Sequence, residues 1–209
     1  MVADRVIARF LADKCPGGVL VDIGCGGGSF AVTARTYFTV AAFDVNEQAM
    51  RTIPRSVTKK WIGTGEAIPL RSNSVNLVTC LDVLEHIPAP QGCIAEAYRI
   101  LKVGGFLFLR TPNPESIGLL LKRKGWFGFR DPTHTTIESI RDWTRRLDQC
   151  GFRVIEGGSN LLSDPPYVGS SRNLPEKVLF QGTNLVSMLV KPYFPWRKGE
   201  NIHILAKKV

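Results

Sequence analysis

The first 110 residues alternate short apolar runs with amphipathic stretches at regular intervals. Short runs rich in β-branched residues indicate buried strands, and apolar residues that recur every three to four positions indicate helices. Strands that alternate with helices in this way are typical of βαβ units, which build a parallel sheet. The pattern predicts strands at 19–23, 39–43, 57–62, 75–80 and 105–110, and helices at 31–37, 47–53 and 91–101.

The pattern loosens after residue 110. Residues 111–135 are rich in proline, glycine and aromatic side chains, which predicts a long loop or a partial helix. Helical spacing resumes over 137–150 and stops at Gly151, a residue type that commonly ends helices. Two further strands are predicted at 152–156 and 201–206, and no internal repeat is visible between them or elsewhere.

The composition is that of one globular domain. The chain has 209 residues, of which 44% are hydrophobic and 22% are charged, so it can bury a sizeable core. No run approaches the roughly 18 consecutive apolar residues that a membrane span needs, and charged residues interrupt the first twenty positions. Its five cysteines form no CxxC pair and no metal-ligand spacing. We therefore expect a single domain over 1–209 that is soluble and cytoplasmic.

A glycine-rich turn is the most informative segment. Four of the five residues 24–28 are glycines, and they lie between the first predicted strand and the first predicted helix. Glycines in that context let the backbone approach a ligand closely. In the register Gly26-x-Gly28-x-x-Ala31 the turn matches the fingerprint of NAD-type dehydrogenases, but this register leaves Gly24 unexplained. Another interpretation is a turn that only permits tight packing of a strand against a helix.

In the register Asp22-x-Gly24-x-Gly26-x-Gly28, the turn resembles motif I of the class I S-adenosylmethionine-dependent methyltransferases, in particular their small type-11-like members. Further segments resemble the same family in order along the chain. They are Asp44 at the end of the second strand, the adenine segment 63–70, the fourth strand and its loop at 75–87, and the helix and turn at 96–106. The resemblance is strong over 19–111, looser at 131–134 and 150–152, and absent from 160–200.

This resemblance implies a Rossmann-like, doubly wound α/β fold with a seven-stranded sheet, mostly parallel with an antiparallel last strand. It also implies S-adenosylmethionine as cofactor, S-adenosylhomocysteine as product and no metal. The glycines would hold the methionine end, Asp44 the ribose hydroxyls, and residues 64–66 the adenine. The cofactor-binding residues expected on this basis are Asp22, Gly24, Cys25, Gly26, Gly28, Asp44, Val45, Thr64, Gly65, Glu66 and Leu81. Thr64 departs from the acidic residue that the family often has there, so adenine recognition would lean on the backbone around Gly65 and on Glu66.

Two histidines are the candidate catalytic residues. A sulfonium methyl group is already electrophilic, so the enzyme mainly holds an acceptor in line with the S–CH3 bond, about 3 Å away. A base is needed only where the acceptor must lose a proton, as a hydroxyl does. His86 follows the fourth strand, and His134 lies in the connection after the fifth, so both belong to the ligand-binding edge of the sheet. We expect Glu85 to cap or orient the loop, and His203 in the last strand to be structural.

Two long segments, 112–135 and 157–200, are expected to cap the acceptor, whereas 1–111 forms the cofactor-binding half. Loops this long are usually functional or disordered, and their aromatic content argues against disorder. The second segment includes a predicted helical stretch near 175–190. Basic and aromatic residues interleave in both segments, which suits an anionic or membrane-associated acceptor, or equally a single nucleic-acid strand. A hydrophobic cover with snorkelling Lys and Arg side chains is the simpler alternative.

The net charge of +9 leans towards the second half, since 1–110 contribute +3 and 111–209 contribute +6. We expect a methyltransferase that acts by direct in-line displacement on a small-molecule or glycan/lipid-type acceptor, with peripheral membrane contact through the basic-aromatic segments. The alternatives are an RNA or protein methyltransferase, an NAD-type dehydrogenase and a non-catalytic S-adenosylmethionine-binding module. Nucleic acid is the less expected partner, because no separate RNA-binding domain is visible.

Overall fold

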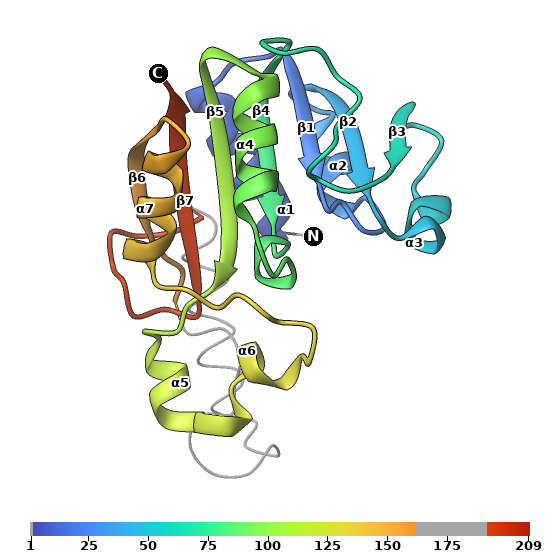
Figure 1. The fold of residues 1–209 in the computed structure, drawn as a ribbon. Helices are drawn as coiled ribbons and strands as arrows, with labels where there is room; N and C mark the ends of the chain where they lie inside the picture. Colours follow the sequence, from blue (N-terminus) through green and yellow to red (C-terminus); the bar gives the residue numbers. More distant parts are fainter. Residues whose placement is uncertain (1, 162–191) are drawn as a thin grey trace.

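A seven-stranded sheet runs through the centre of the molecule (Figure 1). The computed structural model describes residues 2–161 and 192–209. The strands are β1 (Val19–Ile23), β2 (Thr39–Asp44), β3 (Lys59–Ile62), β4 (Val75–Leu81), β5 (Leu101–Pro112), β6 (Phe152–Ser159) and β7 (Asn201–Lys208). Each of them lies where the hydrophobic pattern predicts a strand, so the predicted strand content is confirmed.

The strand order is β3-β2-β1-β4-β5-β7-β6. The five strands β1 to β5 pair in parallel, whereas β7 is antiparallel to both of its neighbours, β5 and β6. The order reverses between β1 and β4, and open α/β sheets bind ligands at such a switch point. The expected doubly wound, mostly parallel sheet with an antiparallel last strand is therefore confirmed.

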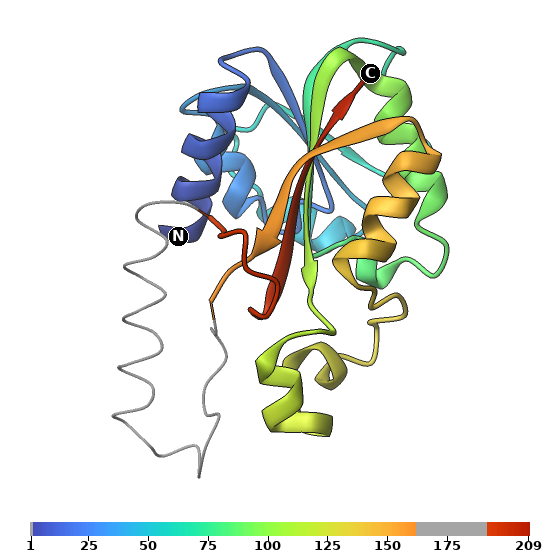
Figure 2. The ribbon, with the colours of Figure 1, turned by 90° about the vertical axis from the view of Figure 1, so that its left-hand side faces the viewer.

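Helices cover both faces of this sheet. Figure 2 shows α1 and α2, in blue, on one face, and α4 in green and α7 in orange on the other. The helices are α1 (Val2–Lys14), α2 (Ser29–Ala34), α3 (Glu47–Thr52), η1 (Leu84–His86), α4 (Gln91–Ile100), α5 (Ile117–Lys122), η2 (Arg123–Gly125), α6 (Phe127–Arg130) and α7 (Ile140–Gln149). Among the described residues, none of these helices has the length and apolarity to cross a membrane.

The side chains of each strand alternate between two apolar layers. In β1, Val21 and Ile23 belong to the layer that also contains Ile94 of α4, whereas Leu20 belongs to the layer that contains Leu11 of α1. Both faces of the central strands are thus buried, which explains why the strands read as nearly continuous apolar runs in the sequence.

Several element boundaries differ from the predicted ones: α2 ends at Ala34 and not at residue 37, and β3 begins at Lys59 and not at residue 57. Two further differences have a local explanation. Strand β5 begins at Leu101, not at residue 105, because Leu101 already pairs with Val75 ahead of a register shift. Helix α7 begins at Ile140, not at residue 137, because the Ser139 hydroxyl accepts a hydrogen bond from the backbone N–H of Asp142 and caps the helix.

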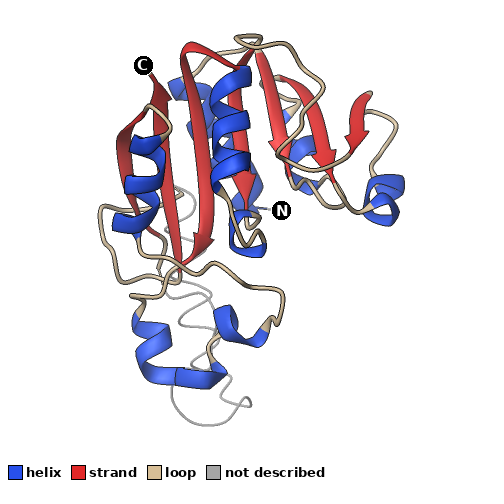
Figure 3. Ribbon diagram, viewed as in Figure 1, coloured by secondary structure: helices blue, strands red, loops and turns tan. Residues whose placement is uncertain are grey.

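The segment after β5 folds into the short helices α5, η2 and α6, which lie beyond the carboxyl edge of the sheet (Figure 3). The backbone N–H of Ile117 donates to the Lys198 carbonyl (3.0 Å), and Trp126 Nε1 donates to Glu200 Oε2 (2.6 Å). The described parts of the two expected capping segments therefore pack against each other. The rest of the second one, with its predicted helix near 175–190, lies outside the described residues.

Candidate active site

The glycine-rich turn connects β1 to α2 through backbone conformations that favour glycine. The φ angles of Gly24, Gly26 and Gly28 are +70°, +50° and +78°. The N–H groups of Gly24 and Cys25 both donate to the Phe43 carbonyl, which ties the turn to β2. A Cβ atom on Gly24 would lie 2.2 Å from a methyl carbon of Val83, so no larger residue fits there without movement. Gly24, which the dehydrogenase register leaves unexplained, is thus the sterically most constrained glycine of the three.

Asp44 ends β2 beside this turn. Its Oδ2 atom accepts a hydrogen bond from the Gly26 N–H (2.7 Å), and its Oδ1 atom accepts one from the Asn46 N–H (2.8 Å). Each oxygen keeps a further lone pair, because a carboxylate offers about four acceptor sites. The carboxylate is therefore fixed at the carboxyl edge of the sheet and can still accept hydrogen bonds from a ligand.

A cavity of about 570 Å³ opens at this edge, a size typical of ligand pockets. It is bounded by the tips of β1, β2 and β4 and by the loop after β3. Its lining residues are Ile23, Gly24, Phe43, Asp44, Val45, Asn46, Gly63, Gly65, Asp82, Val83, His86, Ile87 and Thr133. Five of the predicted site residues meet here, namely Gly24, Asp44, Val45, Gly65 and His86.

A second cavity of about 290 Å³ shares Gly24 with the first. Its lining residues are Asp4, Asp22, Gly24, Cys25, Gly27, Ser29, Phe30, Leu81 and Arg110. The predicted residues Asp22, Cys25 and Leu81 lie here. Four others, Gly26, Gly28, Thr64 and Glu66, line neither of these two cavities.

Asp22 is a buried carboxyl group at the end of β1, 2% exposed. It accepts a hydrogen bond from the Thr79 hydroxyl (2.8 Å). Burial raises the pKa of Asp22 to about 7, despite the opposing effect of this hydrogen bond. The carboxyl group therefore changes its protonation state close to neutral pH.

Asp82 and Arg110 form an ion pair between the two cavities. The sequence alone assigned neither residue a role. Asp82 lines the larger cavity and Arg110 the smaller one, and the Arg110 guanidinium binds the Asp82 carboxylate through Nε (2.9 Å) and Nη2. Asp82 has a φ of +58°, an uncommon conformation for a residue other than glycine and one that is typical of functional sites. A charged residue placed directly after the buried run 75–81 is the sequence signal that could have identified Asp82.

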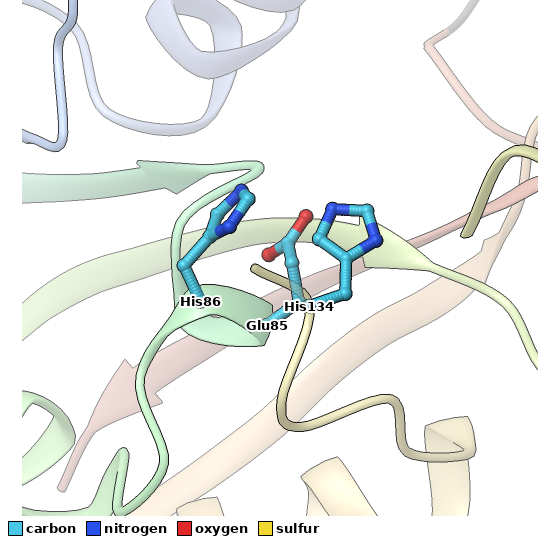
Figure 4. A group of neighbouring side chains, drawn as sticks. All are labelled: Glu85, His86 and His134. Atoms are coloured by element: carbon cyan, nitrogen blue, oxygen red, sulfur yellow. The ribbon is translucent and has the colours of Figure 1, made fainter. Parts of the chain in front are cut away.

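Glu85, His86 and His134 form a cluster beside the larger cavity. Figure 4 shows the Glu85 carboxylate between the two imidazole rings, whose centroids are 4.7 Å apart. The structure thus brings together the two candidate catalytic histidines, although 47 residues separate them in the sequence. His86 lines the cavity, whereas His134 lies behind it and does not.

Glu85 is fully buried, with 0% exposure. Burial, reinforced by the nearby Asp82 charge, raises the pKa of Glu85 to about 8. Its backbone carbonyl accepts hydrogen bonds from the N–H groups of Thr135 (2.8 Å) and Thr136 (3.0 Å). Glu85 therefore does orient the loop, but through its main chain and not through its carboxylate.

His203 lies on β7, 3% exposed, and burial holds its pKa well below the usual value. It lines a third, smaller cavity of about 120 Å³ with Arg110, Asn160 and Asn201. The ring is therefore neutral and belongs to the interior of the sheet, as expected for a structural residue.

A family model described as a methyltransferase domain matches residues 2–157. Among curated proteins, the chain is 30% identical over 123 residues to a ubiquinone biosynthesis O-methyltransferase of Thiobacillus denitrificans, with 54% of this chain and 53% of that protein covered. A protein with the same description from Caulobacter vibrioides is 28% identical over 179 residues, covering 79% of this chain and 70% of its own length. The chain spans about half the length of most of these curated relatives.

Solved structures share the fold at low sequence identity. An S-adenosylmethionine-dependent methyltransferase from Archaeoglobus fulgidus superposes with a TM-score of 0.67 at 18% identity, covering 96% of this chain and 90% of that one. The [4+2]-cyclase SpnF superposes with the same TM-score at 17% identity, covering 98% of this chain and 81% of that one. The fold is therefore common to proteins described by different reactions, and the site must decide the chemistry.

Proposed function

Since this chain belongs to the family of methyltransferase domains, we propose that it transfers a methyl group from S-adenosylmethionine to an oxygen of a small-molecule or glycan/lipid-type acceptor. Dependence on S-adenosylmethionine follows from the family. The choice of oxygen rests on the curated relatives, which are described as O-methyltransferases. The observation that carries the proposal is the pair of adjoining cavities that share Gly24 at the switch point of the sheet.

The residues at this edge fit the expected cofactor. Gly24 lines both cavities, so its backbone is available to a ligand there, while the Val83 side chain fills the space that a Cβ would need. Asp44 offers free carboxylate lone pairs to ribose hydroxyls in the larger cavity, and Gly65 lies there for the adenine. Asp22, Cys25 and the backbone of Leu81 would face the methionine end in the smaller cavity. When bound, the cofactor supplies an electrophilic methyl group and a neutral leaving group, so the protein needs only to align an acceptor.

His86 is the group best placed to receive a proton from an acceptor hydroxyl. Thr133 donates its own hydroxyl proton to Asp131 Oδ1 (2.6 Å), so its oxygen accepts from His86 Nδ1 (2.8 Å). This arrangement places the proton of a neutral His86 on Nδ1 and leaves the Nε2 lone pair free. A free imidazole lone pair beside the cavity is what general-base catalysis requires. His134 does not reach the cavity and would act through its neighbours.

The described part of the capping segments carries exposed apolar and basic side chains side by side. Leu120 is 74% exposed and Phe129 is 54% exposed, and Arg123, Lys124 and Arg130 lie next to them in the chain, also exposed. We infer that this surface selects an anionic or membrane-associated acceptor and makes peripheral contact with lipid headgroups.

The test is transfer of labelled methyl groups from S-adenosylmethionine to a fractionated cell extract, split into lipid, small-molecule, RNA and protein pools. The proposal predicts label in the lipid or small-molecule pool, with His86→Ala as a variant that loses the transfer. Label only in the RNA or protein pool would assign the corresponding alternative function. Cofactor binding without label in any pool would favour a non-catalytic binding module.

A further inference from the structure

The cluster of Glu85, His86 and His134 offers two imidazoles and one carboxylate at a single point. One ligand atom from each of the three residues lies within 4.8 Å of the others. Histidine nitrogen together with carboxylate oxygen is a common donor set for zinc and related divalent ions. Three protein ligands with an open fourth position are typical of metal sites that act on a substrate.

The buried carboxylate of Glu85 points to a cation. Both of its oxygens are buried and lie outside hydrogen-bond distance of any partner among the described residues; the Thr111 hydroxyl, also without a partner, is close enough to lower the pKa of Glu85 slightly. The positive charge of Arg110 acts on Glu85, but the Arg110 guanidinium is already bound to the Asp82 carboxylate. A buried carboxyl group without a partner either stays neutral or binds a cation, and a metal ion at this point would replace its proton.

Both imidazoles are held in the orientation that metal ligands adopt. His134 Nδ1 lies 2.7 Å from the carbonyl oxygen of Gly128, and only a protonated Nδ1 can donate to a carbonyl. His86 Nδ1 donates to Thr133 Oγ1, as described above. In both rings the Nε2 atom makes no hydrogen bond among the described residues, and Asp131 Oδ2 lies 3.9 Å from His134 Nε2. A histidine ligand commonly donates its other ring N–H to a carbonyl or to a similar oxygen in this way.

The backbone fixes the two halves of the cluster to each other. Besides the two bonds to the Glu85 carbonyl, the Thr136 hydroxyl donates to the Ile87 carbonyl (2.8 Å). The loop that carries His134 is therefore tied to η1, which carries Glu85 and His86. Such rigid support is what a metal site requires of its surroundings.

We propose that Glu85, His86 and His134 bind a divalent transition-metal ion, with zinc the best fit to the donors. Ligand atoms of a tetrahedral zinc site lie about 3.4 Å apart, so the cluster must contract by about 1.4 Å at most. His86 is exposed, so a small shift of its side chain that keeps the bond to Thr133 meets little steric resistance. Magnesium fits less well, because it prefers oxygen ligands throughout.

The ion would lie beside the larger cavity, which His86 lines, and the acceptor would occupy the part of that cavity that the ribose and the adenine leave open. Its open position would then bind the acceptor oxygen and lower the pKa of that hydroxyl, and the hydroxyl proton would pass to solvent. With the ion bound, His86 Nε2 is a ligand and no longer the base. This role rests on the proposed O-methyl transfer, whereas binding of the ion does not.

The test is calorimetric titration of the full chain with Zn²⁺ and, separately, with Mg²⁺. We expect one Zn²⁺ per chain and much weaker Mg²⁺ binding. Glu85→Gln and His134→Gln each remove one ligand, and each should weaken Zn²⁺ binding at least tenfold, since even loss of a supporting hydrogen bond costs that much. Glu47→Gln, an exposed carboxylate on α3, is the matched control and should bind Zn²⁺ like the wild type.

Thermal unfolding separates loss of the site from loss of the fold. Metal-free Glu85→Gln should unfold near the wild-type Tm, because glutamine is isosteric with glutamate. His134→Gln loses the imidazole ring and its hydrogen bond to the Gly128 carbonyl, so its response to Zn²⁺ is compared with its own metal-free Tm. Added Zn²⁺ should raise the Tm of the wild type and of Glu47→Gln, but not that of Glu85→Gln or His134→Gln. Absence of stoichiometric Zn²⁺ binding in the wild type, or unchanged affinity in both ligand variants, overturns the proposal.

The same samples are titrated with S-adenosylhomocysteine to keep the two proposals apart. If S-adenosylhomocysteine binds but Zn²⁺ does not, only the metal-site proposal is overturned. If Zn²⁺ binds but S-adenosylhomocysteine does not, the proposed methyl transfer is overturned and the metal-site proposal is supported.

Discussion

The two sides of the candidate active site are built in different ways. The cofactor side, around Gly24 and Asp44, is mainly backbone: strand tips, glycines with positive φ and main-chain hydrogen bonds to Phe43 and Asp44. The acceptor side is made of the side chains of Glu85, on η1, and His134, on the connection after β5. Hydrogen bonds from that connection to the Glu85 carbonyl hold the two segments together. An atom added at Gly24 on the cofactor side would clash with Val83, whereas Glu85 on the acceptor side can be replaced by an isosteric amide.

The largest effect is expected for Gly24→Ala. Alanine at a φ of +70° is strained, and its Cβ would lie 2.2 Å from Val83. Together these should destabilise the fold by about 4 kcal/mol and reduce affinity for S-adenosylhomocysteine at least a hundredfold. Chemical denaturation and calorimetry measure the two losses.

Gly17→Ala is the matched control for that substitution. Gly17 has nearly the same φ, +71°, but a Cβ there meets no atom within 4 Å. It should cost only about 1 kcal/mol and leave cofactor affinity unchanged. Equal losses of stability and of cofactor affinity in the two variants would show that the positive φ of glycine, and not the contact of Gly24 with Val83 or a ligand, explains the effect.

A pH effect on stability is expected from Asp22. Its pKa is about 7 in the folded chain against about 3.9 in an unfolded one, so the folded state holds the proton more tightly. The contribution of this group to the free energy of unfolding should therefore be largest below about pH 4 and fall, by about 4 kcal/mol in total, as the pH rises from there through 7. Asp22→Asn should remove this fall.

Denaturant unfolding at a series of pH values measures the difference between wild type and Asp22→Asn. Asp13→Asn, at an exposed position on α1, is the control and should keep the wild-type profile. Parallel profiles for wild type and Asp22→Asn would contradict the protonated, buried state of this carboxyl group.

Asp44→Ala should reduce affinity for S-adenosylhomocysteine by about 2 kcal/mol, or roughly thirtyfold, because a charge-assisted hydrogen bond is lost. Glu47→Gln, three residues further along, is a control that leaves affinity unchanged. Wild-type affinity in Asp44→Ala, measured by calorimetry, would refute the assignment of the ribose to this carboxylate.

The smallest effect concerns the basic surface of the capping segments. Joint substitution of Arg123, Lys124, Arg197 and Lys198 by Gln should weaken binding to vesicles of anionic phospholipid a few-fold, or about 1 kcal/mol in total, well below the about 1 kcal/mol that each cation contributes when it lies at the membrane surface. Cofactor affinity should not change. The control replaces four exposed cations of the cofactor half: Arg35, Arg55, Lys59 and Lys60. Equal losses of vesicle binding in both variants would mean that net charge alone is responsible.

The cofactor side was the more predictable of the two. Its residues lie in short motifs at strand ends, and parallel topology places those ends at one edge, so the resemblance to the methyltransferase family was enough to predict that Gly24, Asp44 and Gly65 lie together there. By contrast, the contact of His134 with Glu85 depends on the path of a long connection, which no local pattern encodes. The sequence also could not show that the Glu85 carboxyl group is buried without a hydrogen-bond partner, because this depends on how η1 turns the side chain inward.

Helix α1 (Val2–Lys14) shows a second limit of prediction from the sequence, because no helix was predicted there. Its apolar residues Ile7, Ala8 and Leu11 do follow helical spacing, but its stability comes from burial against the sheet, not from a strong local signal. Its position also brings Asp4 to within 2.6 Å of the Ser29 hydroxyl and so into the lining of the smaller cavity. That contribution to the site could be seen only once the helix was placed.

The central claim is that the edge at Gly24 and Asp44 is a site for S-adenosylmethionine. Calorimetric titration of the wild-type chain with S-adenosylhomocysteine and with NAD⁺, side by side, tests it most directly. The account predicts one S-adenosylhomocysteine per chain, loss of that binding in Gly24→Ala but not in Gly17→Ala, and no binding of NAD⁺. Stoichiometric NAD⁺ binding, or S-adenosylhomocysteine binding that Gly24→Ala leaves intact, would contradict it.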